Sequence, residues 1–190
     1  METAFLDLLR TRSAYRAIDP RPVEKDKLQA MLEAAQLSAS CMNLQPWRFL
    51  VLDEPEALEK GRAALADGNY WAKTAPALVI GLSREDLDCR IPDGRDYFLF
   101  DLGMATQNLM LQATEFGLVA RPMAGFKPAV IRAAFGIPES YTILVAIAVG
   151  YEGDLSTLKE KHQKVSVAPR TRNPMEENFF FNQFKEPATS

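Results

Sequence analysis

One long apolar helical pattern constrains the fold of this chain more than any other feature. Between residues 97 and 116, apolar side chains recur three and four positions apart, as they do on one face of a helix: Leu99, Leu102, Ala105, Leu109, Ala113 and Phe116. The positions between them are also largely apolar, so little of this helix suits contact with water. We therefore expect a central helix that packs against several neighbours and ends at Gly117.

Short apolar runs on both sides of this helix predict the strands. They cover residues 47–52, 75–82, 118–123 and 141–149, and the last is rich in β-branched residues. Helical spacing predicts a short helix with Phe5, Leu8 and Leu9 that ends near Arg12, and further helices over 23–37, 55–66 and 128–135. This order of elements indicates an α+β or mixed α/β layout, and we expect an α+β domain with a central mixed sheet of about four to five strands flanked by helices.

The size and composition fit one domain. The 190 residues, 47% hydrophobic and 25% charged, suffice for a sizeable core. We expect residues 1–153 to form the domain body and residues 154–190 a tail of the same domain. The tail is polar but includes an aromatic cluster, Phe-Phe-Phe-Asn-Gln-Phe at 179–184, which needs another surface to cover it. A second subunit is the expected surface.

Several function classes are disfavoured. A net charge of -3 gives no reason to expect nucleic acid or an anionic membrane as partner. No apolar stretch reaches the ~18 residues of a membrane span, and no leader is evident, so we expect a cytoplasmic protein. Cys41 and Cys89 match no metal-ligand spacing and no disulfide framework, and we expect no metal site. The one histidine, His162, lies in a polar run, so we expect it on the solvated surface rather than in catalysis.

Two arginine clusters lie far apart in the sequence. Arg10, Arg12 and Arg16 gather where the first helix ends, and Arg170 and Arg172 lie near the C-terminus. Each cluster alone is commonly explained by the helix dipole or by a solvated surface. Together they can form an anion site, because guanidinium groups match phosphate oxygens. The chain has neither common glycine-rich phosphate loop, so side chains are the remaining means of holding a phosphate.

The loop between the second helix and the first strand is a third candidate. It reads Ser-Ala-Ser-Cys-Met-Asn-Leu-Gln-Pro-Trp over residues 38–47. The simplest interpretation is a connection with Trp47 in the core. Ser40 and Asn43 also offer donors and acceptors for a sugar-alcohol hydroxyl or the edge of a ring.

Four motifs, in order, resemble the nitroreductase family. Residues 12–23, Arg-Ser-Ala-Tyr-Arg-Ala-Ile-Asp-Pro-Arg-Pro-Val, are similar to its opening motif, and residues 40–47 to its Ser-x-x-Asn-x-Gln-Pro-Trp. Residues 117–126, with 135–138 and 149–150, resemble its later half, and residues 170–174 its terminal basic pair. Ala14 stands where the family has serine, with Ser13 before it, so we expect one hydroxyl contact to be lost or shifted.

The resemblance implies an FMN-dependent, intertwined homodimer with two flavin sites at the subunit interface and an extended C-terminal tail. The positions it assigns to the flavin site are Arg12, Ser13, Ala14, Arg16, Ala39, Ser40, Cys41, Asn43, Asn69, Pro122, Met123, Ala124, Gly125, Arg170 and Arg172.

Roles within this set also follow from the resemblance. Arg12, Arg170 and Arg172 would meet the phosphate, and Arg16 would reach the N1/O2 edge of the flavin ring. Ser40 and Asn43 would come from the other subunit. Residues 122–125 would lie along the isoalloxazine, with the backbone amide of Ala124 near N5.

The implied chemistry is hydride transfer from NADH or NADPH, through FMN N5, to a small acceptor such as a nitroaromatic or a quinone, in a ping-pong reaction. No catalytic protein residue is expected, because a cation near N1/O2 and an amide at N5 suffice to tune the flavin. Flavin reductase, enone reductase and reductive dehalogenase activity remain alternatives, as do a non-catalytic FMN store and a structural protein without flavin. Tyr97 and Phe98 border the substrate cavity in one interpretation and belong to the core in another.

Overall fold

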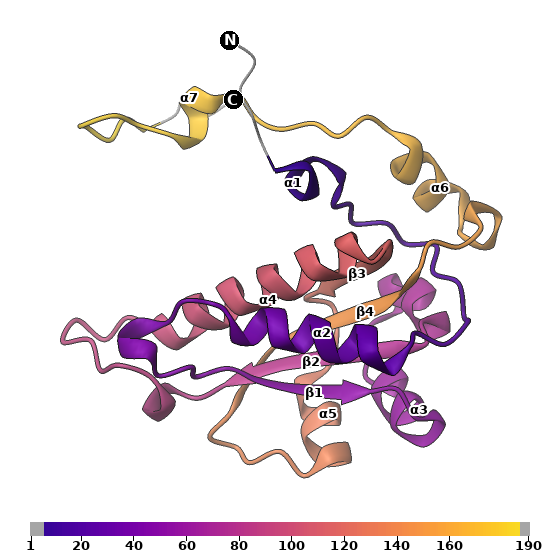
Figure 1. Ribbon diagram of the computed structural model, residues 1–190, viewed down its shortest axis with the longest axis horizontal. Coiled ribbons are helices and arrows are strands. Elements are labelled where there is room, and N and C mark those ends of the chain that lie inside the picture. Colours follow the sequence, from indigo (N-terminus) through magenta and orange to yellow (C-terminus); the bar gives the residue numbers. More distant parts are fainter. Residues whose placement is uncertain (1–5, 187–190) are drawn as a thin grey trace.

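The computed structural model of the chain describes residues 6–186 (Figure 1). Phe5 of the expected first helix and positions 187–190 of the expected tail lie outside the described residues. The elements in chain order are α1 (Asp7–Thr11), α2 (Lys25–Gln36), η1 (Cys41–Asn43), β1 (Arg48–Leu52), α3 (Pro55–Ala63), η2 (Asp67–Thr74), β2 (Ala77–Ser83), η3 (Glu85–Leu87), α4 (Tyr97–Glu115), β3 (Leu118–Met123), α5 (Pro128–Phe135), β4 (Thr142–Tyr151), η4 (Leu155–Thr157), α6 (Glu160–Val167) and α7 (Met175–Asn178).

The α+β class and a sheet of four strands are confirmed, but the mixed pairing is wrong. The strand order is β1-β2-β4-β3, and every neighbouring pair is antiparallel in the described sheet. The strands β2 and β3, which α4 connects, do run in the same direction. The strand β4 lies between them and opposes both, so the helical crossover does not produce a parallel ladder.

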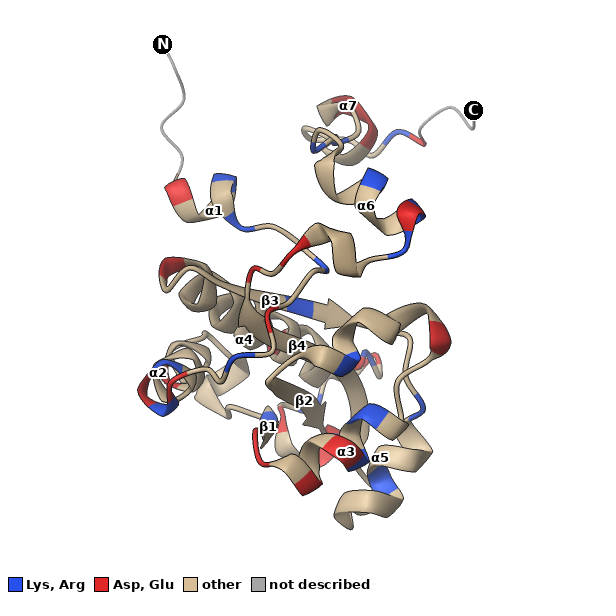
Figure 2. Cartoon of the chain, turned by 90° about the vertical axis from the view of Figure 1, so that its right-hand side faces the viewer, with Lys and Arg blue, Asp and Glu red and all other residues tan. Residues whose placement is uncertain are grey.

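Helices cover both faces of this sheet. Alternate residues of β2 point to opposite sides, as the pleat requires. Leu78 and Ile80 join the core beneath α3 and α5, whereas Ala77 and Val79 join the core beneath α2 and α4. Figures 1 and 2 show these two helical layers on either side of the strands. A sheet buried on both faces explains why β2 has no exposed residue.

The central helix is confirmed at Tyr97–Glu115, though it is not buried all round. Leu102, Ala105 and Leu109 are fully buried against the sheet and α2. A stripe through Phe100, Gly103 and Gln107 is exposed, and Phe100 retains 54% of its accessible surface. An apolar ring so open to water leaves this stripe of α4 available for a further contact.

The observed ends of most helices and strands agree with the bounds predicted from the sequence to within one or two residues, as is usual for such boundaries. The predicted ranges 118–123 and 128–135 match β3 and α5 as observed. The final strand runs on to Tyr151, because Leu118 of β3 pairs with it. The third predicted helix ends early, at Ala63, and the amide of Ala66 then donates to the carbonyl of Gly125.

The C-terminal segment contains two helices, α6 and α7, that the sequence pattern did not predict. They lie on the same side of the domain body as α1 (Figures 1 and 2). Arg170, which follows α6, contacts the segment at α1, because its guanidinium donates to the carbonyl oxygens of Leu9 and Arg12. Phe181 and Phe184 remain 90% and 67% exposed.

No helix in the described range is long and apolar enough to cross a membrane.

Candidate functional site

The two arginine clusters meet in space. A cavity of about 400 Å³ lies between the segment that follows α1, the strand β3 and the segment that follows α6. Figure 2 shows basic positions on β3 and on the segment after α1. The lining residues are Arg12, Ser13, Ala14, Tyr15, Arg16, Arg121, Val165, Ser166, Ala168, Pro169, Arg170, Thr171 and Arg172. We call this cavity the arginine hollow.

Two glycines hold the N-terminal segment against the sheet. A Cβ on Gly150 would lie 2.5 Å from Ile18 Cγ2, and one on Gly153 would lie 2.7 Å from the Asp19 amide nitrogen. The amide of Gly153 also donates to the carbonyl of Ala17 at 2.8 Å. Only glycine permits this close approach, which places residues 17–19, directly after Arg16, against the end of β4.

The arginine hollow concentrates positive charge without acidic partners. Burial, and then the nearby guanidinium groups of Arg170 and Arg172, lower the pKa of Arg12. In the part of the chain that the structure describes, none of the five arginines of the hollow forms an ion pair with a carboxylate. Like charges held together in this way are typical of a site that binds an anion.

Arg121 is the residue of the arginine hollow that the sequence analysis missed. Its guanidinium carbon lies 5.2 Å from the centre of the Trp71 ring. Burial, and then repulsion from Arg16 and Arg12, lower its pKa to about 10. One signal was available, since a charged residue directly before Pro122 interrupts an otherwise apolar strand.

His162 borders the same region and is not the solvated surface residue that we expected. Its ring stacks on Tyr70 with centroids 5.5 Å apart, and Nδ1 lies 3.2 Å from the Tyr70 hydroxyl. Burial, and then Arg16, lower the pKa of His162. The imidazole is therefore predominantly neutral at physiological pH and adds no charge to the hollow.

The end of β3 forms a second recess. Pro122, Met123 and Ala124 line a cavity of about 400 Å³ with Gly103 and Thr106 of α4 and Leu144 and Val145 of β4. Asn69 joins this region, because its Nδ2 donates to the carbonyl of Gly125 at 2.8 Å. A Cβ on Gly125 would lie 2.9 Å from that nitrogen, so glycine allows the contact. The structure thus brings Asn69 and residues 122–125 together.

The loop over residues 38–45 does not line either cavity within one chain. Its backbone is left-handed at Met42 (φ 48°), Asn43 (φ 57°) and Gln45 (φ 50°). Each such residue costs about 1–2 kcal/mol, so the loop depends on tertiary contacts. The Ser40 hydroxyl accepts a hydrogen bond from the Gln45 amide at 3.0 Å. Ala39, Ser40, Cys41 and Asn43 are therefore separated from the arginine hollow in a single chain.

The two cysteines form a disulfide, so the prediction that they match no disulfide framework is wrong. Cys41 in η1 and Cys89 after η3 have Cα atoms 6.0 Å apart, although 48 positions separate them in the sequence. The fold brings them together at the start of α4. Asp88 has a carboxylate oxygen within 4.8 Å of both sulfur atoms. With both sulfurs bonded to each other, only Asp88 of this group can act as a metal ligand.

Two buried carboxyl groups lie beside the disulfide. The Cys41 amide donates to Asp101 Oδ2 at 2.9 Å, and Asp101 has no exposed surface. Burial is the main cause that raises the pKa of Asp101, and the neighbouring Asp88 raises it further. Asp88 Oδ2 and Asp101 Oδ1 are buried and have no hydrogen-bond partner in the described residues.

Comparison with known proteins identifies the family. The family model described as "Nitroreductase family" matches residues 9–86 and 66–151, which is most of the chain. The chain belongs to the nitroreductase family. The resemblance of its motifs is thereby confirmed.

This nitroreductase-family chain is similar to individual relatives and solved structures over most of its length. A Xanthomonas oryzae pv. oryzae protein provisionally named NADH dehydrogenase/NAD(P)H nitroreductase is 31% identical over 172 residues, or 79% of this chain and 87% of that protein. A crystal structure described as an oxidoreductase containing FMN has a TM-score of 0.88 and 29% identity, covering 98% of this chain and 96% of the other. A nitroreductase family protein from Clostridium difficile has a TM-score of 0.79 and 28% identity, covering 96% of this chain and 100% of its own.

Proposed function

We propose that this chain is an oxidoreductase that binds FMN in the arginine hollow and takes electrons from NADH or NADPH. The observation that carries the proposal is the set of five arginines around one cavity, none of which pairs with a carboxylate of the described residues 6–186. A phosphate monoester carries about -1.5 to -2 charges at neutral pH and compensates this repulsion. The names of the Xanthomonas protein and of the FMN-containing structure support the same assignment.

Different side chains of the arginine hollow would bind different parts of FMN. Arg12, Arg170 and Arg172 would bind the phosphate, each charge-assisted hydrogen bond contributing about 1.5–3 kcal/mol. Arg16 would face the N1/O2 edge of the ring and stabilise negative charge there. With Ala14 in place of the family's serine, the backbone amides of Ser13 and Ala14 remain as donors.

Residues beyond β3 would form the wall against the ring. Pro122 and Met123 would lie along the isoalloxazine, and the amide of Ala124 would face N5. The hydrogen bond from Asn69 to the Gly125 carbonyl supports this role, because it holds the segment in place. We add Arg121 to the site as a second cation beside Arg16.

A homodimer would complete the site. Ala39, Ser40, Cys41 and Asn43 would reach the flavin from a second copy, since their own chain keeps them away from the arginine hollow. The exposed stripe of α4 and the exposed rings of Phe181 and Phe184 are surfaces that a second copy would cover. In this arrangement residues 1–153 form the flavin-binding body and residues 154–190 the tail that contacts the phosphate and embraces the partner.

When bound, FMN supplies the redox chemistry at N5, passing a hydride equivalent from the nicotinamide to a small acceptor in a ping-pong sequence. The protein needs no acid or nucleophile of its own for this. The side chains of the hollow bind, orient and tune the cofactor, and the open recess beside α4 admits donor and acceptor in turn. A nitroaromatic or a quinone is the expected class of acceptor.

The test starts with the absorption spectrum of purified protein after incubation with FMN and gel filtration. We expect a retained flavin band that bleaches without oxygen when NADH or NADPH is added. Turnover with nitroaromatics, quinones, free flavin, enones and halogenated aromatics then identifies the acceptor. A protein that stays colourless with excess FMN refutes the proposal, and retained flavin that neither nicotinamide bleaches indicates an FMN store.

A further inference from the structure

The disulfide constrains the loop over residues 38–45, the segment of the proposed flavin site whose backbone includes left-handed non-glycine residues. Cys41 opens η1, and the three left-handed residues follow it within four positions. The hydrogen bonds along this stretch in the described structure are Cys41 N to Asp101 Oδ2, Asn43 N to Ser40 O, Leu44 N to Cys41 O, Gln45 N to Ser40 Oγ, Gln45 Nε2 to Asn43 O, Arg48 to Gln45 O, and one between the Gln36 and Gln45 side chains. The disulfide is the covalent link in addition to them.

We propose that the Cys41–Cys89 pair is a reversible redox site which controls how tightly the protein holds FMN, with a dithiol as its reductant. This inference rests on the proposed function, because Ser40 and Asn43 matter for the flavin only if FMN binds. In the oxidised state the covalent link keeps the loop in its left-handed conformation. In the reduced state the loop can relax, and Ser40 and Asn43 lose their fixed positions.

The chemistry is a thiol–disulfide exchange. A thiolate of the dithiol attacks one sulfur of the pair, and the S–S bond breaks while a mixed disulfide forms. The second thiolate of the same reductant then attacks the mixed disulfide. The protein gains two electrons and two protons as two thiols, and the reductant leaves as a cyclic disulfide.

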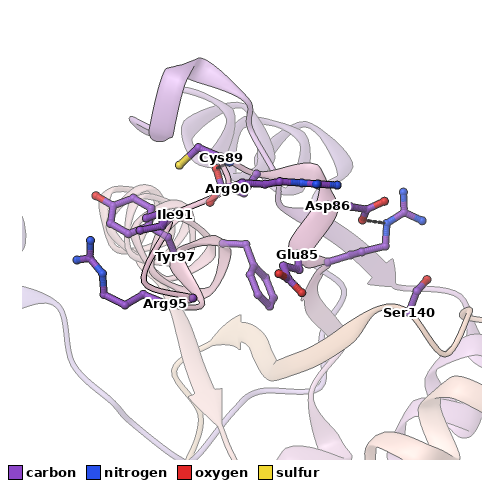
Figure 3. A pocket seen from close by; sticks show the side chains of 12 residues that line it. Glu85, Asp86, Cys89, Arg90, Ile91, Arg95, Tyr97 and Ser140 are labelled. Carbon is purple, nitrogen blue, oxygen red and sulfur yellow. Dashed lines mark hydrogen bonds and ion pairs between the residues drawn. The ribbon is translucent and has the colours of Figure 1, made fainter.

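Both cysteine residues lie where such a reagent can approach. Cys41 and Cys89 are both partly exposed. Cys89 lies in the wall of an open cavity of about 460 Å³, with Arg90 beside it and Tyr97 across from it (Figure 3). Buried structural disulfides lack an approach of this kind, whereas exposed ones undergo exchange readily.

The position of Asp101 couples the pair to the loop. Asp101 belongs to α4, whose core-facing residues are fully buried, so its carboxyl group is a fixed point for the Cys41 amide. Asp88, next to Cys89, has a carboxylate oxygen within 4.8 Å of both sulfur atoms. The disulfide therefore joins η1, which Asp101 anchors through the Cys41 amide, to the segment that contains Cys89, and a change at the sulfurs acts directly on η1.

The experiment compares the FMN dissociation constant of the full chain before and after treatment with dithiothreitol. Alkylation under denaturing conditions and intact mass establish the number of thiols in each state. We expect the reduced protein to bind FMN about tenfold more weakly, as expected when one left-handed residue is no longer held in place. The variant Cys89→Ser breaks the link without changing the sequence of the flavin loop, so its FMN dissociation constant should match that of the reduced protein and should not respond to dithiothreitol.

A second measurement needs no flavin. Hydrogen exchange at the amides of Cys41, Leu44 and Gln45 should accelerate on reduction and in Cys89→Ser, while the amides of β4 report that the global fold persists. Equal FMN dissociation constants in the two states overturn the proposal and leave the proposed function intact. Oxidised protein that binds no FMN refutes the proposed function instead. In that case the hydrogen-exchange data alone test whether reduction of the Cys41–Cys89 pair releases the loop, and unchanged exchange rates at these amides overturn the proposal.

Discussion

Replacement of Arg121 by methionine should have opposite effects on the free protein and on its complex with FMN. The pKa of Arg121 lies at about 10, against an ordinary value of 12.5. At about 1.4 kcal/mol per pH unit, this difference corresponds to roughly 3 kcal/mol of penalty on the charged form. Because the guanidinium borders an open cavity, solvent screening reduces the penalty to about 1–2 kcal/mol.

The sign follows from linkage. A basic group with a lowered pKa in the folded state destabilises the fold wherever it is protonated, which here means at any pH below about 10. Arg121→Met removes this penalty and also the contact with Trp71, worth about 0.5–1 kcal/mol. The free variant should therefore be more stable than the wild type by up to about 1 kcal/mol. Its FMN dissociation constant should rise roughly tenfold or more, since one charge-assisted contact is lost.

Urea denaturation at neutral pH, with and without saturating FMN, measures both quantities. Arg95→Met is the matched control, because Arg95 is exposed and its ion pair in the described residues is with Asp93. Its replacement should change the free energy of unfolding and the free energy of FMN binding by less than about 1 kcal/mol each. A free Arg121→Met protein that is less stable than the wild type by about 1 kcal/mol or more, with unchanged FMN affinity, would refute the reasoning.

Three further predictions concern other parts of the site. Arg12→Ala should cost about 2 kcal/mol or more of FMN binding through a lost phosphate contact, and unchanged flavin retention after gel filtration would contradict that role. Removal of residues 175–190 should yield a monomer or loosened flavin, which light scattering and flavin content measure, and a truncated chain that stays a yellow dimer argues against the role of the tail. Burial raises the pKa of Asp101, so the stability this group contributes is present at acid pH and is lost as pH rises through its raised pKa. The free energy of unfolding of Asp101→Asn should therefore rise relative to that of the wild type over this pH range, and a difference independent of pH in chemical denaturation would be inconsistent with a raised pKa at Asp101.

The sequence alone predicted the local elements well. Apolar spacing over a few residues located α4, and it placed β3 and α5 at their observed bounds, because each side chain's direction follows from its neighbours along the chain. It also singled out Arg12, Arg16, Arg170 and Arg172, which the structure gathers around one cavity. Motif order sufficed for the family, which the comparisons confirm.

The tertiary structure decided what depends on contacts between distant segments. The insertion of β4 between β2 and β3 made the pairing antiparallel, and no local pattern distinguishes that arrangement from a parallel crossover. Arg121 lies in the arginine hollow because the fold places β3 beside segments that are distant in the sequence. Cys41 and Cys89 form a disulfide for the same reason, although 48 positions separate them. Periodicity encodes which face of an element is buried, whereas the partner that buries it is selected by the packing of the whole chain.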